Sequence, residues 1–226
     1  MSGELFIEGI FREELKNRFL CIVEVDGADT LCYIPSSCRL SNFVDLSEKK
    51  VLLKSISTPG SRTKYSVYAL RLGRQYVLLN MSHSNRIIED ALRGRRFSFL
   101  GERKKVKREY IVEDYKCDLY IEKTKTIIEI KSILSFGEDA IFPTVFSRRA
   151  IDQLTILGDL LERGYKVVYI FVTMYSGVKR VSINKASDEY YYLLYKCIER
   201  GMVIKGYSVS MNGYCPSING SIDVII

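Results

Sequence analysis

Hydrophobic and polar positions divide this chain into two parts that follow different periodicities. In residues 3–80, short runs of β-branched and aromatic residues are separated by turn residues such as Asp26-Gly27, Pro59-Gly60 and Gly73. The strands predicted from these runs are Leu5–Phe11, Phe19–Val25, Leu31–Ile34, Val51–Ser57, Tyr65–Leu70 and Tyr76–Leu79. Five or six strands in so short a stretch are typical of a small closed barrel such as an OB-fold.

From residue 81 onward, helical and strand patterns alternate. Ile87, Ile88, Ala91 and Leu92 recur at helical spacing and predict a helix within Met81–Gly94. The later predicted elements are a strand at Glu109–Val112, a hairpin at Cys117–Ser132, a helix from about Phe146 to Arg163, a strand at Lys166–Thr173, a helix capped by Ser187 and ending near Arg200, and a strand at Met202–Val209.

The predicted fold class is α/β in an α+β two-domain arrangement. Residues 1–80 form an OB-like β-barrel domain that binds nucleic acid, and residues 81–226 form a mixed sheet flanked by helices. The run Lys166–Thr173 is almost continuously apolar, which is typical of a strand covered on both faces. In the tail, Asn219-Gly220 predicts a hairpin turn and Val224–Ile226 an edge strand.

The hairpin at Cys117–Ser132 carries the most specific chemistry. Side chains two apart on a strand share a face, so Glu129 and Lys131 point the same way, and Asp118 lies at about their level. Two carboxylates and an ammonium at one end of a sheet can hold Mg²⁺ or Mn²⁺ and help to cleave a phosphodiester bond. The carbonyl of Ile130 would be a third metal ligand. The alternative is an ordinary hairpin with a solvated face and a surface ion pair.

Three more residues are candidates for supporting roles. Gln153, early in the following helix, could reach the nucleophilic water or a phosphate, and Arg149 could clamp a phosphate bidentately. Glu109 precedes the hairpin and could act as an auxiliary acid. The alternative for Gln153 and Arg149 is a solvated helix residue, and for Glu109 it is an ion pair with Lys107 or Arg108.

The formal net charge of +7 is unevenly distributed. Residues 93–108 contain eight basic residues and one acidic residue, so this basic window alone carries +7. It favours salt-sensitive contacts with a phosphate backbone, with a solvated basic segment as the alternative. Residues 3–80 are nearly balanced, with 11 basic and 9 acidic residues. The candidates for nucleic-acid binding are Arg18, Arg39, Arg95, Arg96, Arg103, Lys104, Lys105, Lys107 and Arg149.

Cysteine usage and the N-terminal segment favour a cytoplasmic protein. The six cysteines form no CxxC pair and no regular framework, which predicts reduced core thiols. The N-terminus lacks the pattern of a secretory signal, and no stretch is apolar enough to span a membrane. With His83 as the single histidine, a zinc site is not expected. No membrane partner is expected, and a homo-oligomer is left open.

Short blocks that occur in a fixed order resemble the sugar fermentation stimulation protein (SfsA) family over nearly the whole chain. The blocks are Asn17–Phe19 (NRF), Ile34–Leu40 (IPSSCRL), Asn80–Ile87 (NMSHSNRI), Cys117–Ser132 (CDLYIE and IEIKS), Phe142–Ala150 (FPTVFSRRA) and Ser187–Gly201 (SDEYYYLLYKCIERG). The chain differs from the family pattern at Ser36, Cys38, Lys116, Thr144 and Gln153.

This resemblance implies an N-terminal OB-like barrel and a C-terminal domain of the restriction-endonuclease-like PD-(D/E)xK fold. It implies that Asp118, Glu129 and Lys131 bind metal and catalyse, with Arg149 in support. Two functions follow as hypotheses. The first is a Mg²⁺- or Mn²⁺-dependent nuclease that cleaves DNA, with RNA not excluded. The second is a non-catalytic DNA-binding regulator of sugar metabolism genes that keeps the nuclease fold.

Overall fold

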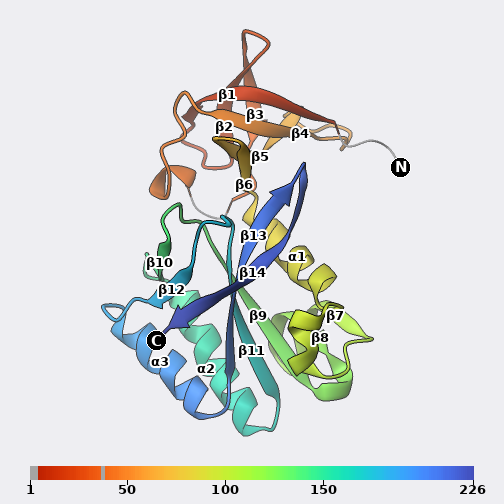
Figure 1. Ribbon diagram of the computed structural model, residues 1–226, viewed down its shortest axis with the longest axis vertical. Coiled ribbons are helices and arrows are strands. Elements are labelled where there is room, and N and C mark those ends of the chain that lie inside the picture. Colours follow the sequence, from red (N-terminus) through yellow and green to blue (C-terminus); the bar gives the residue numbers. More distant parts are fainter. Residues whose placement is uncertain (1–4, 37–38) are drawn as a thin grey trace. The chain divides into compact units, whose positions relative to one another are not determined.

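The computed structural model of the protein describes residues 5–36 and 39–226 (Figure 1). The chain divides into two compact units. The first contains the residues up to His83 together with Ser210–Ser217, and the second contains Ser84–Val209 together with Ile218–Ile226.

The first unit is built around a single six-stranded sheet. Its strands are β1 (Phe6–Glu14), β2 (Leu20–Val25), β3 (Ala28–Tyr33), β4 (Lys50–Ser55), β5 (Tyr65–Leu72) and β6 (Gln75–Leu78). The strand order is β3-β2-β1-β4-β5-β6, and β3 also pairs with β5, so the sheet closes on itself. Asp26 and Gly27 make the predicted turn between β2 and β3, both with positive φ, which favours glycine at the second position. The six predicted strands are confirmed.

The second unit is a mixed sheet with helices. Its elements are α1 (Ser84–Ala91), β7 (Val106–Val112), β8 (Tyr115–Ile121), β9 (Thr126–Ile133), β10 (Asp139–Phe142), α2 (Arg148–Glu162), β11 (Lys166–Thr173), β12 (Arg180–Ile183), α3 (Asp188–Glu199), β13 (Val203–Asn212) and β14 (Cys215–Ile225). The strand order is β10-β12-β14-β13-β11-β9-β8-β7.

The helices of this unit cover the sheet in two places. α2 and α3 lie side by side (Figure 1) and bury Leu154, Leu157 and Leu194 in a cluster with Tyr169 and Phe171 of β11. α1 packs on β8 and β9. Seven of the eight residues of β11 are buried, which confirms the prediction of a strand covered on both faces.

The tail differs from its prediction. Gly213, with a φ of 59°, starts the turn that joins β13 to β14, so Asn219-Gly220 lies inside β14. β14 lies between β12 and β13, and the expectation of an edge strand was therefore wrong. The sequence contains two Asn-Gly pairs, and Asn212-Gly213 makes the turn. Strict alternation of burial along β14 continues through the second pair.

Three shorter expectations also need correction. β10 and β12 are present but were not predicted, because β10 lies between Gly137 and Pro143 and β12 follows Gly177, and such residues are typical of loops. α3 starts after Ser187 as expected, although the Ser187 side chain makes no capping hydrogen bond within the described chain. Cys215 is exposed, contrary to the prediction of core thiols, and Cys38 lies outside the described residues. The buried free thiols are Cys21, Cys32, Cys117 and Cys197.

No helix within residues 5–36 and 39–226 combines the length and the apolar character needed to cross a membrane.

Candidate metal centre on the β8–β9 hairpin

The predicted hairpin is formed by β8 and β9. A short 3₁₀ turn over Glu122–Thr124 joins the strands, and Lys125 follows in the left-handed conformation. The β8–β9 ladder runs from Ile121↔Thr126 to Leu119↔Ile128 and ends there, while β9 continues beside β11. Beyond Ile128, the edge of β9 that faces β8 therefore needs another hydrogen-bonding partner.

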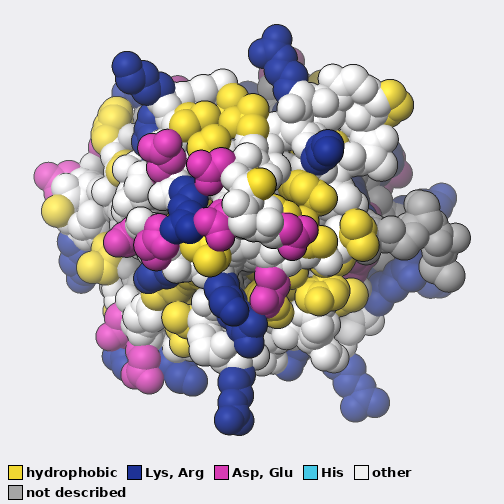
Figure 2. Space-filling view, turned by 90° about the horizontal axis from the view of Figure 1, so that it is seen from above, with side chains coloured by type: hydrophobic (Ala, Val, Ile, Leu, Met, Phe, Trp, Pro, Cys, Tyr) yellow, Lys and Arg dark blue, Asp and Glu magenta, His cyan; other side chains and the backbone are white. Residues whose placement is uncertain are grey.

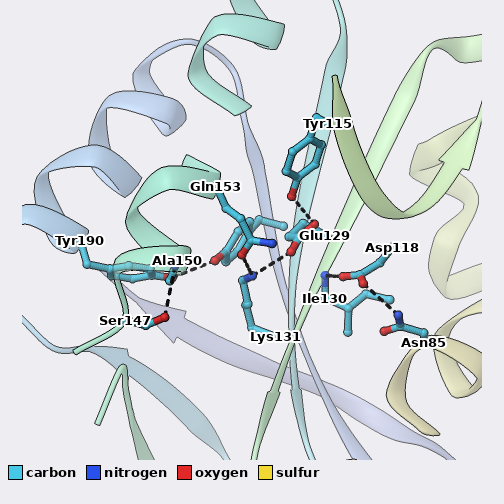
Figure 3. Close-up of polar contacts among 11 residues, drawn as sticks. Asn85, Tyr115, Asp118, Glu129, Ile130, Lys131, Ser147, Ala150, Gln153 and Tyr190 are labelled. Carbon is cyan, nitrogen blue, oxygen red and sulfur yellow. Dashed lines mark hydrogen bonds and ion pairs between the residues drawn. The ribbon is translucent and has the colours of Figure 1, made fainter. Parts of the chain in front are cut away.

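Asp118 supplies that partner. Its Oδ2 atom accepts a hydrogen bond from the backbone N–H of Ile130 at 2.8 Å (Figure 3). Its Oδ1 atom accepts a second hydrogen bond, at 2.9 Å, from the side-chain amide of Asn85 on α1. Burial, and then the neighbouring Glu129, raise the pKa of Asp118 to about 6.

Side chains on both sides of Asp118 in β8 are buried. Tyr115, Cys117 and Tyr120 all pack in one hydrophobic cluster. Glu109, which the β7–β8 register places opposite Asp118, has a φ of 45°.

Glu129 and Lys131 form the second half of the site. The Glu129 side chain is only 4% exposed, and its Oε1 atom lies 2.8 Å from Nζ of Lys131. Its Oε2 atom accepts a hydrogen bond of 2.6 Å from the hydroxyl of Tyr115. Lys131 also lies over the ring of Tyr169, with Nζ 5.4 Å from the ring centroid. The expectation that Glu129 and Lys131 share a face is confirmed.

Helix α2 contributes the remaining contact. Ser147 caps the helix by accepting a hydrogen bond from the N–H of Ala150, which fixes the start of its first turn. Gln153 then accepts a hydrogen bond of 2.6 Å from Nζ of Lys131 (Figure 3). The ammonium of Lys131 is therefore held between a carboxylate and an amide oxygen.

These oxygen atoms are suitable ligands for a hard divalent cation. Asp118 and Glu129 supply two carboxylates, and Mg²⁺ commonly binds one or two carboxylates while keeping several waters. The N–H and C=O of one strand residue point to the same edge, so the carbonyl of Ile130 points toward the Asp118 side, as its N–H does. Within residues 5–36 and 39–226, no group of three or more acidic, histidine or cysteine side chains could hold a metal. Waters would complete the coordination.

Two supporting candidates, Glu109 and Arg149, have exposed side chains. Glu109 pairs with Lys116 on the exposed face of β7 and β8. Arg149 is exposed on the first turn of α2. In the described part of the chain, neither residue makes a hydrogen bond or ion pair with Asp118, Glu129 or Lys131.

The basic window is partly used within the second unit. Arg96 donates to the backbone carbonyls of Ile218 and Asn219, at 3.3 and 3.0 Å, and Arg103 donates to the carbonyl of Phe97. Two further cations form ion pairs, Lys107 with Glu122 and Arg108 with Glu89. The exposed cations of the window that make no such contact within the described chain are Arg93, Arg95, Lys104 and Lys105.

The candidates in the first unit have local partners. Arg18 is exposed, and its guanidinium lies 4.8 Å from the ring centroid of Phe19. Arg39 donates to the backbone carbonyl of Lys16 at 2.8 Å. Figure 2, viewed from above Figure 1, shows Lys and Arg side chains scattered among Asp and Glu, without one large patch of a single sign.

Sequence reasoning missed two of the residues that contact the carboxylates. Asn85 lies 33 residues before Asp118, and the only signal for it is its place in the block Asn80–Ile87. Tyr115 precedes the hairpin block, and no local pattern distinguishes its hydroxyl from those of the other 15 tyrosines.

Comparison with protein families decides the relationship. A family model described as the sugar fermentation stimulation protein RE domain matches residues 82–214. A second, described as the SfsA N-terminal OB domain, matches residues 15–79. The chain belongs to the sugar fermentation stimulation protein family.

Individual relatives agree with this assignment. Sugar fermentation stimulation protein homologues from Natranaerobius thermophilus and Clostridium beijerinckii are 26% and 23% identical to this chain. The matches cover 92% and 93% of this chain and 91% and 93% of the relatives. A solved structure of Pyrococcus furiosus SfsA, described as a complex with Ca²⁺, superposes with a TM-score of 0.81 at 21% identity. That match covers all of this chain and 98% of the other, and it supports the two-domain α+β fold.

Proposed function

We propose that the second unit is a Mg²⁺- or Mn²⁺-dependent phosphodiesterase that cleaves nucleic acid, with DNA as the first candidate substrate. One observation carries the proposal: Asp118 and Glu129 flank the peptide of Ile130 where β8 and β9 separate, with Lys131 in contact with Glu129. The buried group holds two carboxylates and one ammonium. A divalent cation there would balance the second carboxylate.

Asp118, Glu129 and the carbonyl of Ile130 would hold the cation. When bound, it would lower the pKa of a coordinated water and offset charge on the phosphate. The P. furiosus relative is described as a complex with Ca²⁺, a cation that generally takes oxygen ligands, and this supports the proposal of a divalent cation here. Lys131 would orient the attacking water or a phosphate oxygen, and Gln153 would hold the Lys131 ammonium in place.

Exposed cations of the basic window would bind the phosphate backbone. Arg93, Arg95, Lys104 and Lys105 are the members of the window with exposed side chains and no ion pair or backbone contact within the described residues. Such contacts depend on counterion release, so the affinity for DNA should fall steeply with salt. An affinity that stays flat between low and moderate salt would contradict this part of the proposal.

A cytoplasmic location belongs to the same proposal. Cys21 and Cys32 are directly opposite in the β2–β3 ladder, yet both are free thiols. Unpaired cysteines in such close register are compatible with a reducing compartment, where disulfides are rare.

The test is cleavage of single- and double-stranded DNA and of RNA in Mn²⁺. Glu129→Ala and Lys131→Ala should each lower the rate by about 10²-fold or more, because each removes a group placed in the reaction. Glu162→Gln is the matched control, since Glu162 lies at the exposed end of α2, where it pairs with Arg200. This control should cleave at the wild-type rate.

Other outcomes separate the rival functions. Equal cleavage by the wild type and both alanine variants would indicate a contaminating nuclease and refute the proposal. DNA binding without cleavage under any divalent cation would favour the non-catalytic DNA-binding regulator. Cleavage of RNA alone would keep the chemistry and change the substrate.

A further inference from the structure

Two neutral side chains that lie outside β9 donate hydrogen bonds to the carboxylates of Glu129 and Asp118. The hydroxyl of Tyr115 donates to Oε2 of Glu129 at 2.6 Å, and Tyr115 is 5% exposed. The amide of Asn85 donates to Oδ1 of Asp118 at 2.9 Å. Figure 3 shows Tyr115 and Asn85 reaching Glu129 and Asp118 from different sides.

Each carboxylate is thereby held at both of its oxygens. For Glu129 the second donor is the ammonium of Lys131, and for Asp118 it is the backbone N–H of Ile130. A carboxylate oxygen has two lone pairs, so one hydrogen bond leaves each oxygen able to bind a cation. Two donors per carboxylate restrict its rotation before any metal binds. A carboxylate without these donors would lose this rotational freedom on binding the metal, at a cost in conformational entropy.

We propose that Tyr115 and Asn85 are positioning residues that hold Glu129 and Asp118 in the orientation that binds the divalent cation. This inference rests on the proposed function, because it assumes that the two carboxylates bind metal. Both donors are neutral, so they orient the carboxylates without cancelling the charge that attracts a cation. A cationic donor in either place would compete with the metal electrostatically.

The two donors belong to different elements. Tyr115 lies on β8, where its ring packs in the core cluster with Leu154 and Tyr169. Asn85 lies in the first turn of α1, which packs on β8 and β9. The position of each carboxylate therefore depends on packing outside β9, so that loss of either donor should loosen one ligand and leave the other in place.

The test is Mn²⁺ binding by calorimetry, together with the Mn²⁺-induced shift in melting temperature, for the wild type, Tyr115→Phe and Asn85→Ala. Outer hydrogen-bond partners of metal ligands typically contribute 10- to 100-fold in affinity. We expect each variant to bind Mn²⁺ at least about tenfold more weakly than the wild type. The melting-temperature shift at a fixed Mn²⁺ concentration should shrink accordingly.

A matched control separates positioning from stability. The hydroxyl of Tyr190 makes a buried hydrogen bond of 3.1 Å with the hydroxyl of Tyr169 and none with either carboxylate within the described chain. Tyr190→Phe therefore also removes a buried hydroxyl from the core. It should lower stability by an amount similar to Tyr115→Phe but bind Mn²⁺ like the wild type.

The outcomes distinguish this inference from the proposed function. If the wild type binds Mn²⁺ and both variants bind within twofold of it, positioning is refuted and the proposed metal site stands. If Tyr190→Phe weakens binding as much as Tyr115→Phe, the effect is general destabilisation and the inference is also refuted. If the wild type binds no Mn²⁺, the proposed function fails, and the inference fails with it.

Discussion

Each unit of this protein contains a group in which a carboxylate, a cation and a tyrosine hydroxyl meet, and these two groups differ in burial, since the one in the first unit is largely exposed and the one in the second is buried. In the first unit, Glu8 lies 3.0 Å from Arg71 and accepts a hydrogen bond of 2.5 Å from Tyr76. The hydrogen bond from Tyr76 and the charge of Arg71 lower the pKa of Glu8. The Glu8 side chain is 38% exposed, so water screens this group.

The buried counterpart is Glu129 with Lys131 and Tyr115. Burial, and then the charge of Glu129, raise the pKa of Tyr115. Here a second carboxylate, Asp118, is added, and its pKa is about 6 instead of below its usual range. The same set of side chains therefore makes a neutralised surface pair in one unit and, in the other, a buried group with excess negative charge. Burial and the extra carboxylate, more than the residue types, are therefore the features on which the proposed cation site rests.

Substituting Glu129 and Glu8 should give the largest difference in free energy of unfolding between the two groups. Glu129→Gln removes the carboxylate that contacts the buried ammonium of Lys131 directly, and breaking a buried pair typically costs about 3–5 kcal/mol. Glu8→Gln breaks an exposed pair and should cost about 0–1 kcal/mol. Denaturant unfolding in EDTA measures both free energies. Equal losses for the two variants would show that burial does not distinguish the groups.

The pH dependence of stability tests the role of Asp118. Its folded pKa of about 6 lies above the ordinary value of 3.8 for an aspartate side chain, so the folded state binds the proton more tightly than the unfolded state. This contribution to stability is full below about pH 4 and is lost as the pH rises through 6. The loss amounts to about 3 kcal/mol in metal-free protein. We expect Asp118→Asn to remove this part of the pH dependence.

The pH dependence attributed to Asp118 is measured as the difference in free energy of unfolding between the wild type and Asp118→Asn, from pH 4 to pH 7 in EDTA. The wild type should lose stability relative to the variant over this range. Added Mn²⁺ should restore the wild type above pH 6, because a cation stabilises the charged carboxylate. A difference that is independent of pH would mean that Asp118 titrates alike in the folded and unfolded states.

The smallest expected effect is that of salt on the coupling energies of the two ion pairs. At 1 M salt the screening length is about 3 Å, so the coupling between Glu8 and Arg71 should fall toward zero from a value of at most about 1 kcal/mol. The coupling between Glu129 and Lys131 should change little, because both side chains are largely buried. Double-mutant cycles at 0.1 and 1 M NaCl measure both couplings. A coupling at Glu129 that disappears in salt would place that pair in contact with water.

Local pattern was sufficient for most elements. Strands separated by turn residues, the apolar run of β11 and the helix that ends before Gly164 were all predicted, because each depends on a period or on a turn residue within the element itself. The short strands β10 and β12 were not, since each lies close to a glycine or proline that is typical of a loop. The choice between Asn212-Gly213 and Asn219-Gly220 depended on where β14 finds its partners in the sheet.

The contacts of the candidate site also divide into those that local pattern predicts and those that it does not. The sequence by itself determined that Glu129 and Lys131 share a face and that Asp118 lies at their level, because strand alternation and a short turn impose both. Only the tertiary structure decided that β8 leaves β9 at Asp118, that Asn85 reaches it from α1, and that Tyr115 reaches Glu129. Those contacts depend on how helices and strands distant in sequence pack together, and no local period encodes that packing.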